Sequence, residues 1–210
     1  MSQWFALLVL VLAGAAAPAA AQSFESAYTD LDLDKCKHTP GVEAEDSGFW
    51  QCRGYVGIDV RVAEGDLRMF VSFGPDAEKQ PAAGQTFSNF NNVDKRRIEW
   101  RMETTDGKKG APFAAILRWD VQVSEQRNAK RGQALVVTRL GDAVCHVGYV
   151  DATANRNANE LARKLAEEHA RNFDCEKDKR LVIGKQGRSI ERMVELIEME
   201  EQEKKTPQQK

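Results

Sequence analysis

Apolar and polar residues alternate through the middle of the chain, which is the pattern of β-strands that bury one face. The first alternating stretch is 55–74, where two runs meet at the turn sequence Glu64-Gly65-Asp66. Its apolar positions are Val56, Ile58, Val60, Val62, Leu67, Met69, Val71 and Phe73. This stretch therefore predicts a β-hairpin.

The same pattern predicts two further hairpins, in 96–123 around an Asp106-Gly107 turn and in 133–150 around a Gly141-Asp142 turn. One face of the 96–123 hairpin is apolar through Ile98, Trp100, Met102, Leu117, Trp119, Val121 and Val123. The other face carries Arg97, Glu99, Arg101, Glu103, Arg118, Asp120 and Gln122, which predicts a solvated surface of cross-strand charge pairs. Six strands in three sequential hairpins predict a twisted antiparallel sheet with one covered face.

A helical period follows the strands in 153–173 and predicts the cover of that sheet. The expected buried stripe is Ala158, Leu161, Ala162, Leu165, His169 and Phe173. A second helix is expected from Ser189 to about 204, with apolar residues only in its first half at Ile190, Met193, Val194 and Ile197. Strands followed by helices predict an α+β fold with a partly exposed terminal helix and a frayed tail.

The N-terminus predicts a secretory leader, because the run from Trp4 to Gln22 has no charged residue and ends in Ala19, Ala20 and Ala21 before a polar stretch. We expect cleavage before Gln22. An uncleaved membrane anchor is the alternative, since the run approaches the roughly 18 to 20 apolar residues that span a bilayer. The predicted organisation is a signal peptide over 1–21, one α+β domain over 22–175, and a basic turn, helix and tail over 176–210.

The four cysteines are even in number, follow the leader and form no Cys-x-x-Cys pair, which predicts two disulfides in an exported protein rather than a zinc site. Of the three possible connectivities we favour Cys36 with Cys52 and Cys145 with Cys175, because each pairs sequence neighbours. A periplasmic or secreted location follows. The segment 145–175 is similar in general character to small exported bacterial proteins, a similarity that implies no activity.

The stretch Leu181 to Ile190 resembles the Gly-x-x-Gly loop of KH-type RNA-binding domains through Gly184 and Gly187. A KH fold needs a sheet around that loop, and here one helix ends the chain. The net charge of −2 on 210 residues also predicts no nucleic-acid partner. We interpret the glycines as a turn before the last helix, beside a basic cluster of Lys177, Lys179, Arg180, Lys185 and Arg188.

Residues that could carry catalysis are few, and we expect no catalytic site, metal or cofactor. We interpret His169 as a core histidine, while His146 adjoins a disulfide cysteine and His38 stands alone in a loop. The familiar Gly-x-Ser-x-Gly and His-Glu-x-x-His motifs are not found. A hydrolase would have to use carboxylates of the polar face, such as Asp59, Glu99 and Asp120.

The segment between Phe73 and Arg97 is long for a connection between two hairpins, and long ordered loops often carry function. Its second half mixes aromatic anchors with adaptable amides, as recognition loops do, in the candidate binding residues Phe87, Asn89, Phe90, Asn91 and Asn92. Alternatively, both phenylalanines pack against the sheet edge, or a short strand forms near Gln85 to Phe90.

Three classes of function stay open. The first, which we favour, is an exported binding module that recognises an unknown protein or envelope component through this loop. The second is a hydrolase that uses the polar-face carboxylates. The third is a structural or assembly protein of the cell envelope whose terminal helix docks on a partner. We expect a monomer or weak dimer, with no stable membrane span after leader cleavage.

Overall fold

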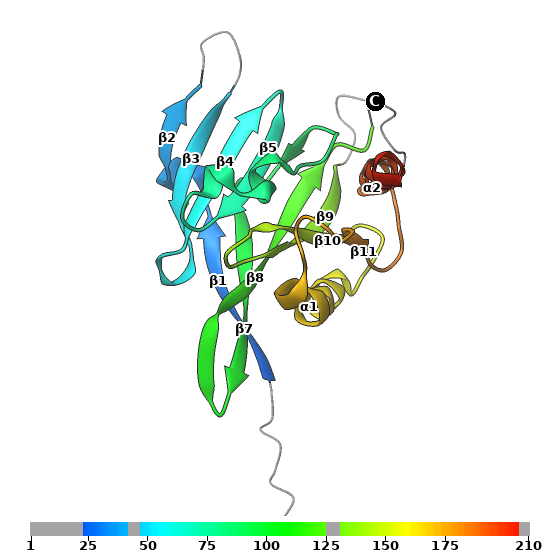
Figure 1. Cartoon of the computed structure of the whole chain (residues 1–210). Helices are drawn as coiled ribbons and strands as arrows, with labels where there is room; N and C mark the ends of the chain where they lie inside the picture. Colours follow the sequence, from blue (N-terminus) through cyan, green and yellow to red (C-terminus); the bar gives the residue numbers. More distant parts are fainter. Residues whose placement is uncertain (1–22, 42–46, 125–130, 206–210) are drawn as a thin grey trace, which may run out of the picture.

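The part of the chain that the structure describes forms two β-sheets and two α-helices. Figure 1 shows how they are arranged. The computed structural model describes residues 23–41, 47–124 and 131–205. The predicted leader over 1–21 lies outside the described residues. No helix of the described ranges is long and apolar enough to cross a membrane.

The strands of the larger sheet are β1 (Ser23–Leu31), β6 (Asn91–Asn92), β7 (Arg96–Thr105), β8 (Lys108–Val121), β9 (Gly132–Arg139), β10 (Cys145–Asp151) and β11 (Leu181–Val182). The strands of the smaller sheet are β2 (Lys37–Pro40), β3 (Gly48–Arg53), β4 (Asp59–Gly65) and β5 (Arg68–Phe73). The helices are α1 (Ala158–His169) and α2 (Glu191–Lys205).

The predicted α+β class is confirmed, and the three predicted hairpins form, but they divide between two sheets. The order in the seven-stranded sheet is β1-β7-β8-β9-β10-β11, with β6 also paired to β8, and the order in the four-stranded sheet is β2-β3-β4-β5. The sheet is mixed because β11 pairs with β10 in parallel. The edge strand β1 did not show in the sequence pattern, because eight of its nine residues keep some contact with solvent and little alternation results.

The two ends of the β4–β5 hairpin differ from the predicted pattern. Val56 lies in a turn before β4 with a φ of 48° and is 72% exposed, so it is not a strand residue. Leu67 also leaves the predicted apolar face, because it and Asp66 form the two-residue turn with φ values of 57° and 52°. Paired positive φ angles match the twist of a tight hairpin. Leu67 is consequently 49% exposed.

The main core lies between the two sheets. The smaller sheet contributes side chains such as Val62, Val71 and Phe73, and the larger sheet contributes Trp100 and Trp119. The ring of Phe73 meets that of Trp100 edge-on, with centroids 5.6 Å apart. The turn before α2 adds Ile190, and the helix itself adds Met193 and Ile197; these side chains are 1%, 1% and 4% exposed. The first half of the terminal helix therefore docks on the core of its own chain.

A second core lies between the larger sheet and α1. The helix buries Ala158, Ala162, Leu165 and Ala166, and the sheet offers side chains that include Ile116, Leu135 and Val147. The predicted stripe is right in Ala158, Ala162, Leu165 and Phe173, and Leu161 is partly buried. It is wrong at His169, whose side chain is 42% exposed beside Glu168. Both faces of the larger sheet are thus covered, one by the smaller sheet and one by α1.

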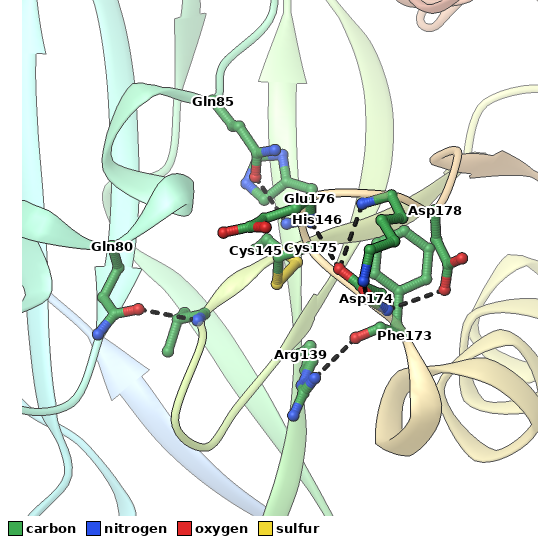
Figure 2. The surroundings of a disulfide bond; sticks show 12 residues. Gln80, Gln85, Arg139, Cys145, His146, Phe173, Asp174, Cys175, Glu176 and Asp178 are labelled. Carbon is green, nitrogen blue, oxygen red and sulfur yellow. Dashed lines mark hydrogen bonds and ion pairs between the residues drawn. A yellow bond between two sulfur atoms is a disulfide. The ribbon is translucent and has the colours of Figure 1, made fainter.

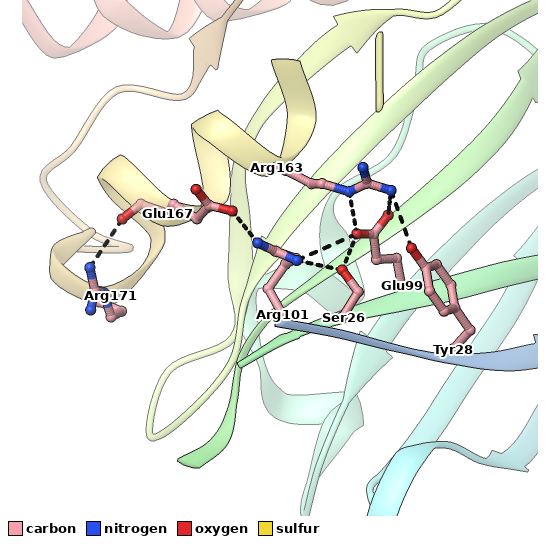
Figure 3. A network of polar contacts seen from close by, with 7 residues as sticks. All are labelled: Ser26, Tyr28, Glu99, Arg101, Arg163, Glu167 and Arg171. Carbon is pink, nitrogen blue, oxygen red and sulfur yellow. Dashed lines mark hydrogen bonds and ion pairs between the residues drawn. The ribbon is translucent and has the colours of Figure 1, made fainter. Parts of the chain in front are cut away.

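The charged face of β7 is accordingly buried in the middle of the strand. The prediction that this face is a solvated surface is wrong there. Glu99 and Arg101 are 7% and 5% exposed. Arg163 of α1 donates from Nε to Glu99 Oε1 at 2.6 Å, and Arg101 forms an ion pair with Glu167 of α1 (Figure 3). Ser26 of β1 bonds both Glu99 and Arg101. These pairs attach α1 and β1 to the middle of the sheet.

The two predicted disulfides are confirmed as Cys36 with Cys52 and Cys145 with Cys175. The first joins Cys36, directly before β2, to Cys52 of β3 and so links neighbouring strands of the smaller sheet. The second joins β10 to the chain just beyond α1, where Arg139 also donates to the carbonyl oxygen of Phe173 at 2.6 Å (Figure 2). The second disulfide therefore fixes the end of the α1 segment covalently to the larger sheet.

Removing the second disulfide should destabilise the protein. The sequence separation of 30 residues in Cys145–Cys175 predicts a loss of about 3 to 4 kcal/mol in the double alanine variant, because the unfolded chain gains conformational freedom. Urea denaturation of the variant measures this loss. The matched variant lacking Cys36–Cys52, with a separation of 16, should lose about 3 kcal/mol. An unchanged midpoint for wild type in reducing agent would contradict both expectations.

Candidate functional site

The long loop between β5 and β7 is ordered by hydrogen bonds to the start of β10. It contains two short 3₁₀ turns, η3 (Ala77–Lys79) and η4 (Pro81–Gly84). Gln80 accepts from the amide of Val144 at 2.9 Å, and Gln85 accepts from the amide of His146 at 2.7 Å (Figure 2). These glutamines satisfy one backbone donor just before β10 and one within it, and they hold the first half of the loop in place.

The asparagines of the second half are used mainly to build the loop. Asn91 is 5% exposed, accepts from the amide of Met69 at 3.0 Å and donates to Thr86 at 3.1 Å. Asn89 donates to the carbonyl oxygen of Gln122 at 2.7 Å, and Asn92 accepts from the amide of Asp94 at 2.7 Å. The short strand of the loop is β6, later than the alternative near Gln85 to Phe90.

The two phenylalanines of the loop have opposite environments. Phe87 is 2% exposed and packs its ring 5.5 Å from Trp119 and 5.7 Å from Tyr149, measured between centroids. Phe90 is 43% exposed, although its carbonyl oxygen accepts from the amide of Gln122. Phe87 therefore anchors the loop in the core and has almost no surface left for a ligand, whereas Phe90 offers its ring to solvent on a fixed backbone.

A surface groove of about 380 Å³ adjoins Phe90. Its walls come from the loop, from the residues after β8, and from the start of α2, and they are Ser88, Asn89, Phe90, Gln122, Val123, Ser124, Arg188, Glu191 and Arg192. Val123 was predicted to lie in the return strand of the 96–123 hairpin, but β8 ends at Val121 and Val123 follows it. The groove thus combines an exposed aromatic ring, two guanidinium groups and amide side chains.

Sequence reasoning named Phe90 and Asn89 as recognition residues but missed Glu191 and Arg192. These lie about a hundred residues further along, on a helix whose docking position no local pattern reveals. Arg188, predicted as part of a basic cluster, does line the groove. Arg180 of the same cluster is instead 9% exposed, donating to Tyr149 Oη and forming an ion pair with Glu200.

The Gly-x-x-Gly loop is held by two buried polar side chains, Asp151 at the end of β10 and Asn155 between β10 and α1. Asn155 pairs with the backbone of Lys185 in both directions, donating at 2.8 Å and accepting at 2.9 Å. Asp151 accepts from the amide of Ser189 at 3.2 Å. A Cβ at Gly184 would lie 2.7 Å from Asn155 Oδ1, and one at Gly187 would lie 2.7 Å from Asp151 Oδ2. Close packing against these oxygens explains both glycines.

The buried histidine of the protein is His146 and not His169. It is 1% exposed, and its Nδ1 lies 2.9 Å from Tyr149 Oη, which also accepts from Arg180 at 3.1 Å. Burial and the positive charge of Arg180 lower the pKa of His146 to about 3. Burial also raises the pKa of Tyr149 to about 12. His146 is therefore a neutral core residue, while His38 stacks on Trp50 in the smaller sheet.

The carboxylates considered for a hydrolase are placed apart or paired. Asp59 is in β4 of the smaller sheet, so it is not a cross-strand neighbour of Glu99 or Asp120. Glu99 is bound by Arg163, and Asp120 forms an ion pair with Arg96. Among the described residues, no group of three or more His, Cys, Asp or Glu side chains is arranged to hold a metal ion.

No protein-family model, no curated protein and no solved structure matches this chain. The groove beside Phe90 consequently has to be interpreted from its own chemistry.

The buried His146 should make stability depend on pH. The folded protein holds this pKa near 3, below the ordinary value of 6.5, so the unfolded chain binds one more proton between these values. The free energy of unfolding should therefore fall as the pH decreases through this window, by up to about 1.4 kcal/mol per pH unit. Urea denaturation at several pH values measures the slope.

The variant His146→Gln should reduce this slope, because a neutral amide replaces the titrating ring. The matched variant His38→Gln changes an exposed histidine of β2 and should keep the wild-type slope. Equal slopes in both variants would show that His146 does not contribute to the acid sensitivity.

Proposed function

We propose that this protein is an exported, non-enzymatic binding module that recognises a protein or another envelope component in the groove beside Phe90. The leader-like N-terminal sequence and the two disulfides support export to an oxidising compartment, periplasmic or secreted. Within that proposal the protein acts as a monomer or weak dimer.

The observation that carries the proposal is the exposure of Phe90 within an otherwise anchored loop. Phe87, Asn89 and Asn91 are all engaged in packing or hydrogen bonds, so the loop backbone is held before any ligand arrives. A fixed aromatic side chain at a groove loses little entropy on binding, and aromatic and arginine side chains dominate binding energies at protein interfaces. Phe90, Arg188 and Arg192 supply that combination.

The charge of the groove favours an acidic partner segment with an apolar side chain. Arg188 and Arg192 are two cations against the single carboxylate of Glu191. Guanidinium groups bind carboxylates through paired hydrogen bonds, and Phe90 and Val123 provide apolar contact. The other two classes of function gain no such support. Of the carboxylates considered for a hydrolase, Glu99 and Asp120 are bound to arginines and Asp59 lies in the other sheet. The apolar side chains in the first half of α2, Met193 and Ile197, are already covered by its own chain.

Substituting Phe90 should abolish binding without unfolding the protein. We expect Phe90→Ala to change the free energy of unfolding by about 1 kcal/mol or less, because the ring is 43% exposed. A photoreactive phenylalanine at position 90 should cross-link to a partner in the native compartment. The cross-linked species should be competed by excess wild-type protein and not by excess Phe90→Ala.

The matched control places the same photoreactive residue at Val56, which is 72% exposed. Val56 lies in the turn before β4, whereas Phe90 is next to Asn91, whose amide donates to Leu67 in the turn at the other end of the β4–β5 hairpin. Position 56 should give no specific product. Equal products from positions 56 and 90, or full competition by Phe90→Ala, would contradict recognition in this groove.

A further inference from the structure

A second pocket, on the α1 side of the larger sheet, is lined by five cationic side chains. Its volume is about 500 Å³, and the cations are Lys95, Arg96, Arg97, Arg118 and Arg163. They come from the start of β7, from β8 and from α1. One carboxylate, Glu99, also lines the pocket. Such convergence of cations from three elements needs an explanation, because like charges at one site repel one another.

Four of the five cations have carboxylate partners. Lys95 pairs with Asp32 and Asp34, Arg96 with Asp120, Arg97 with Asp30, and Arg163 with Glu99. Except for Glu99, these carboxylates do not line the pocket. They pair with the cations outside the pocket and fix the positions of the cationic side chains. Arg163 also donates to the hydroxyl oxygen of Tyr28 at 3.2 Å, and this contact aligns the guanidinium beside the Tyr28 ring (Figure 3).

Arg118 is different, because its hydrogen-bond partners are neutral amides. It donates to Gln133 Oε1 at 3.3 Å and to Asn159 Oδ1 at 2.9 Å. Burial and the charge of Arg96 lower the pKa of Arg118, although the charge of Asp120 offsets this in part. The Nε of Arg96 is also buried without a hydrogen-bond partner in the described part of the chain. Positive charge at the centre of the pocket is therefore incompletely compensated.

We propose that this pocket binds a tetrahedral oxyanion, a phosphate or sulfate group carried by a small molecule, with Arg118 as its main contact. Guanidinium groups form paired hydrogen bonds with such groups, and cations from three directions suit an anion with several acceptor oxygens. The ring of Tyr28, which is 47% exposed, also lines the pocket and offers apolar contact to the carrier, while Ile116 and Leu135 line it as nearly buried side chains. This site is separate from the groove beside Phe90 and does not depend on its function.

Calorimetric titration of the full mature protein with inorganic phosphate and with sulfate, at constant ionic strength in chloride, tests the proposal. We expect one saturable site in wild type, weakened roughly ten-fold or more in Arg118→Gln, because a charge-assisted hydrogen bond is lost. The relative affinities of phosphate and sulfate then indicate which group the natural ligand carries. The control Arg192→Gln, in the groove beside Phe90, should bind as wild type does.

Chemical-shift mapping of wild type provides a measurement that needs no variant. Phosphate or sulfate should perturb the methyl groups of Ile116 and Leu135 and the side-chain amide of Asn159. Perturbations that centre on Arg188 and Arg192 would overturn the proposal. So would unchanged affinity in a folded Arg118→Gln variant, an affinity no higher than that of chloride, or tighter binding of acetate, which would indicate a carboxylate site.

Discussion

Strand β8 is buried on both faces, and the arrangement of the other layers follows from that burial. Its successive residues Ala114, Ala115, Ile116 and Leu117 point alternately into the α1 core and into the core between the sheets. A strand of this kind cannot leave either face in water, so one sheet face requires the smaller sheet and the other requires α1. The hydrophobic effect on this strand thus demands three layers rather than two.

The same burial creates the ionic network of Figure 3. Once α1 covers β7, Glu99 and Arg101 lose water, and a buried charge is tolerated only with a partner and hydrogen bonds. Arg163 and Glu167 of the helix provide those partners. Such pairs contribute little net stability, but they allow one register of the helix on the sheet, because a shifted helix would leave both charges unpaired.

Local patterns predicted much of the fold. The Asp106-Gly107 hairpin, the alternation around Trp100 and Trp119, and the alanine and leucine stripe of α1 are each determined by neighbours a few residues away, and each forms as expected. The neighbour pairing of the cysteines was also right. Edge strands such as β1 were missed because they bury too few side chains to alternate. His169 was wrongly assigned to the core because burial depends on which element covers a residue.

The sequence by itself determined the three hairpins, the two helices, the favoured disulfide pairing and a loop rich in aromatic and amide residues. Only the tertiary structure decided that Phe87 is an anchor while Phe90 faces a groove with Arg192, and that Arg118 meets four other cations. The physical reason is the distance along the chain between the residues that interact. Periodicity and turn chemistry act between residues close in the chain, whereas a site is assembled from segments up to about a hundred residues apart, whose meeting depends on how complete layers pack.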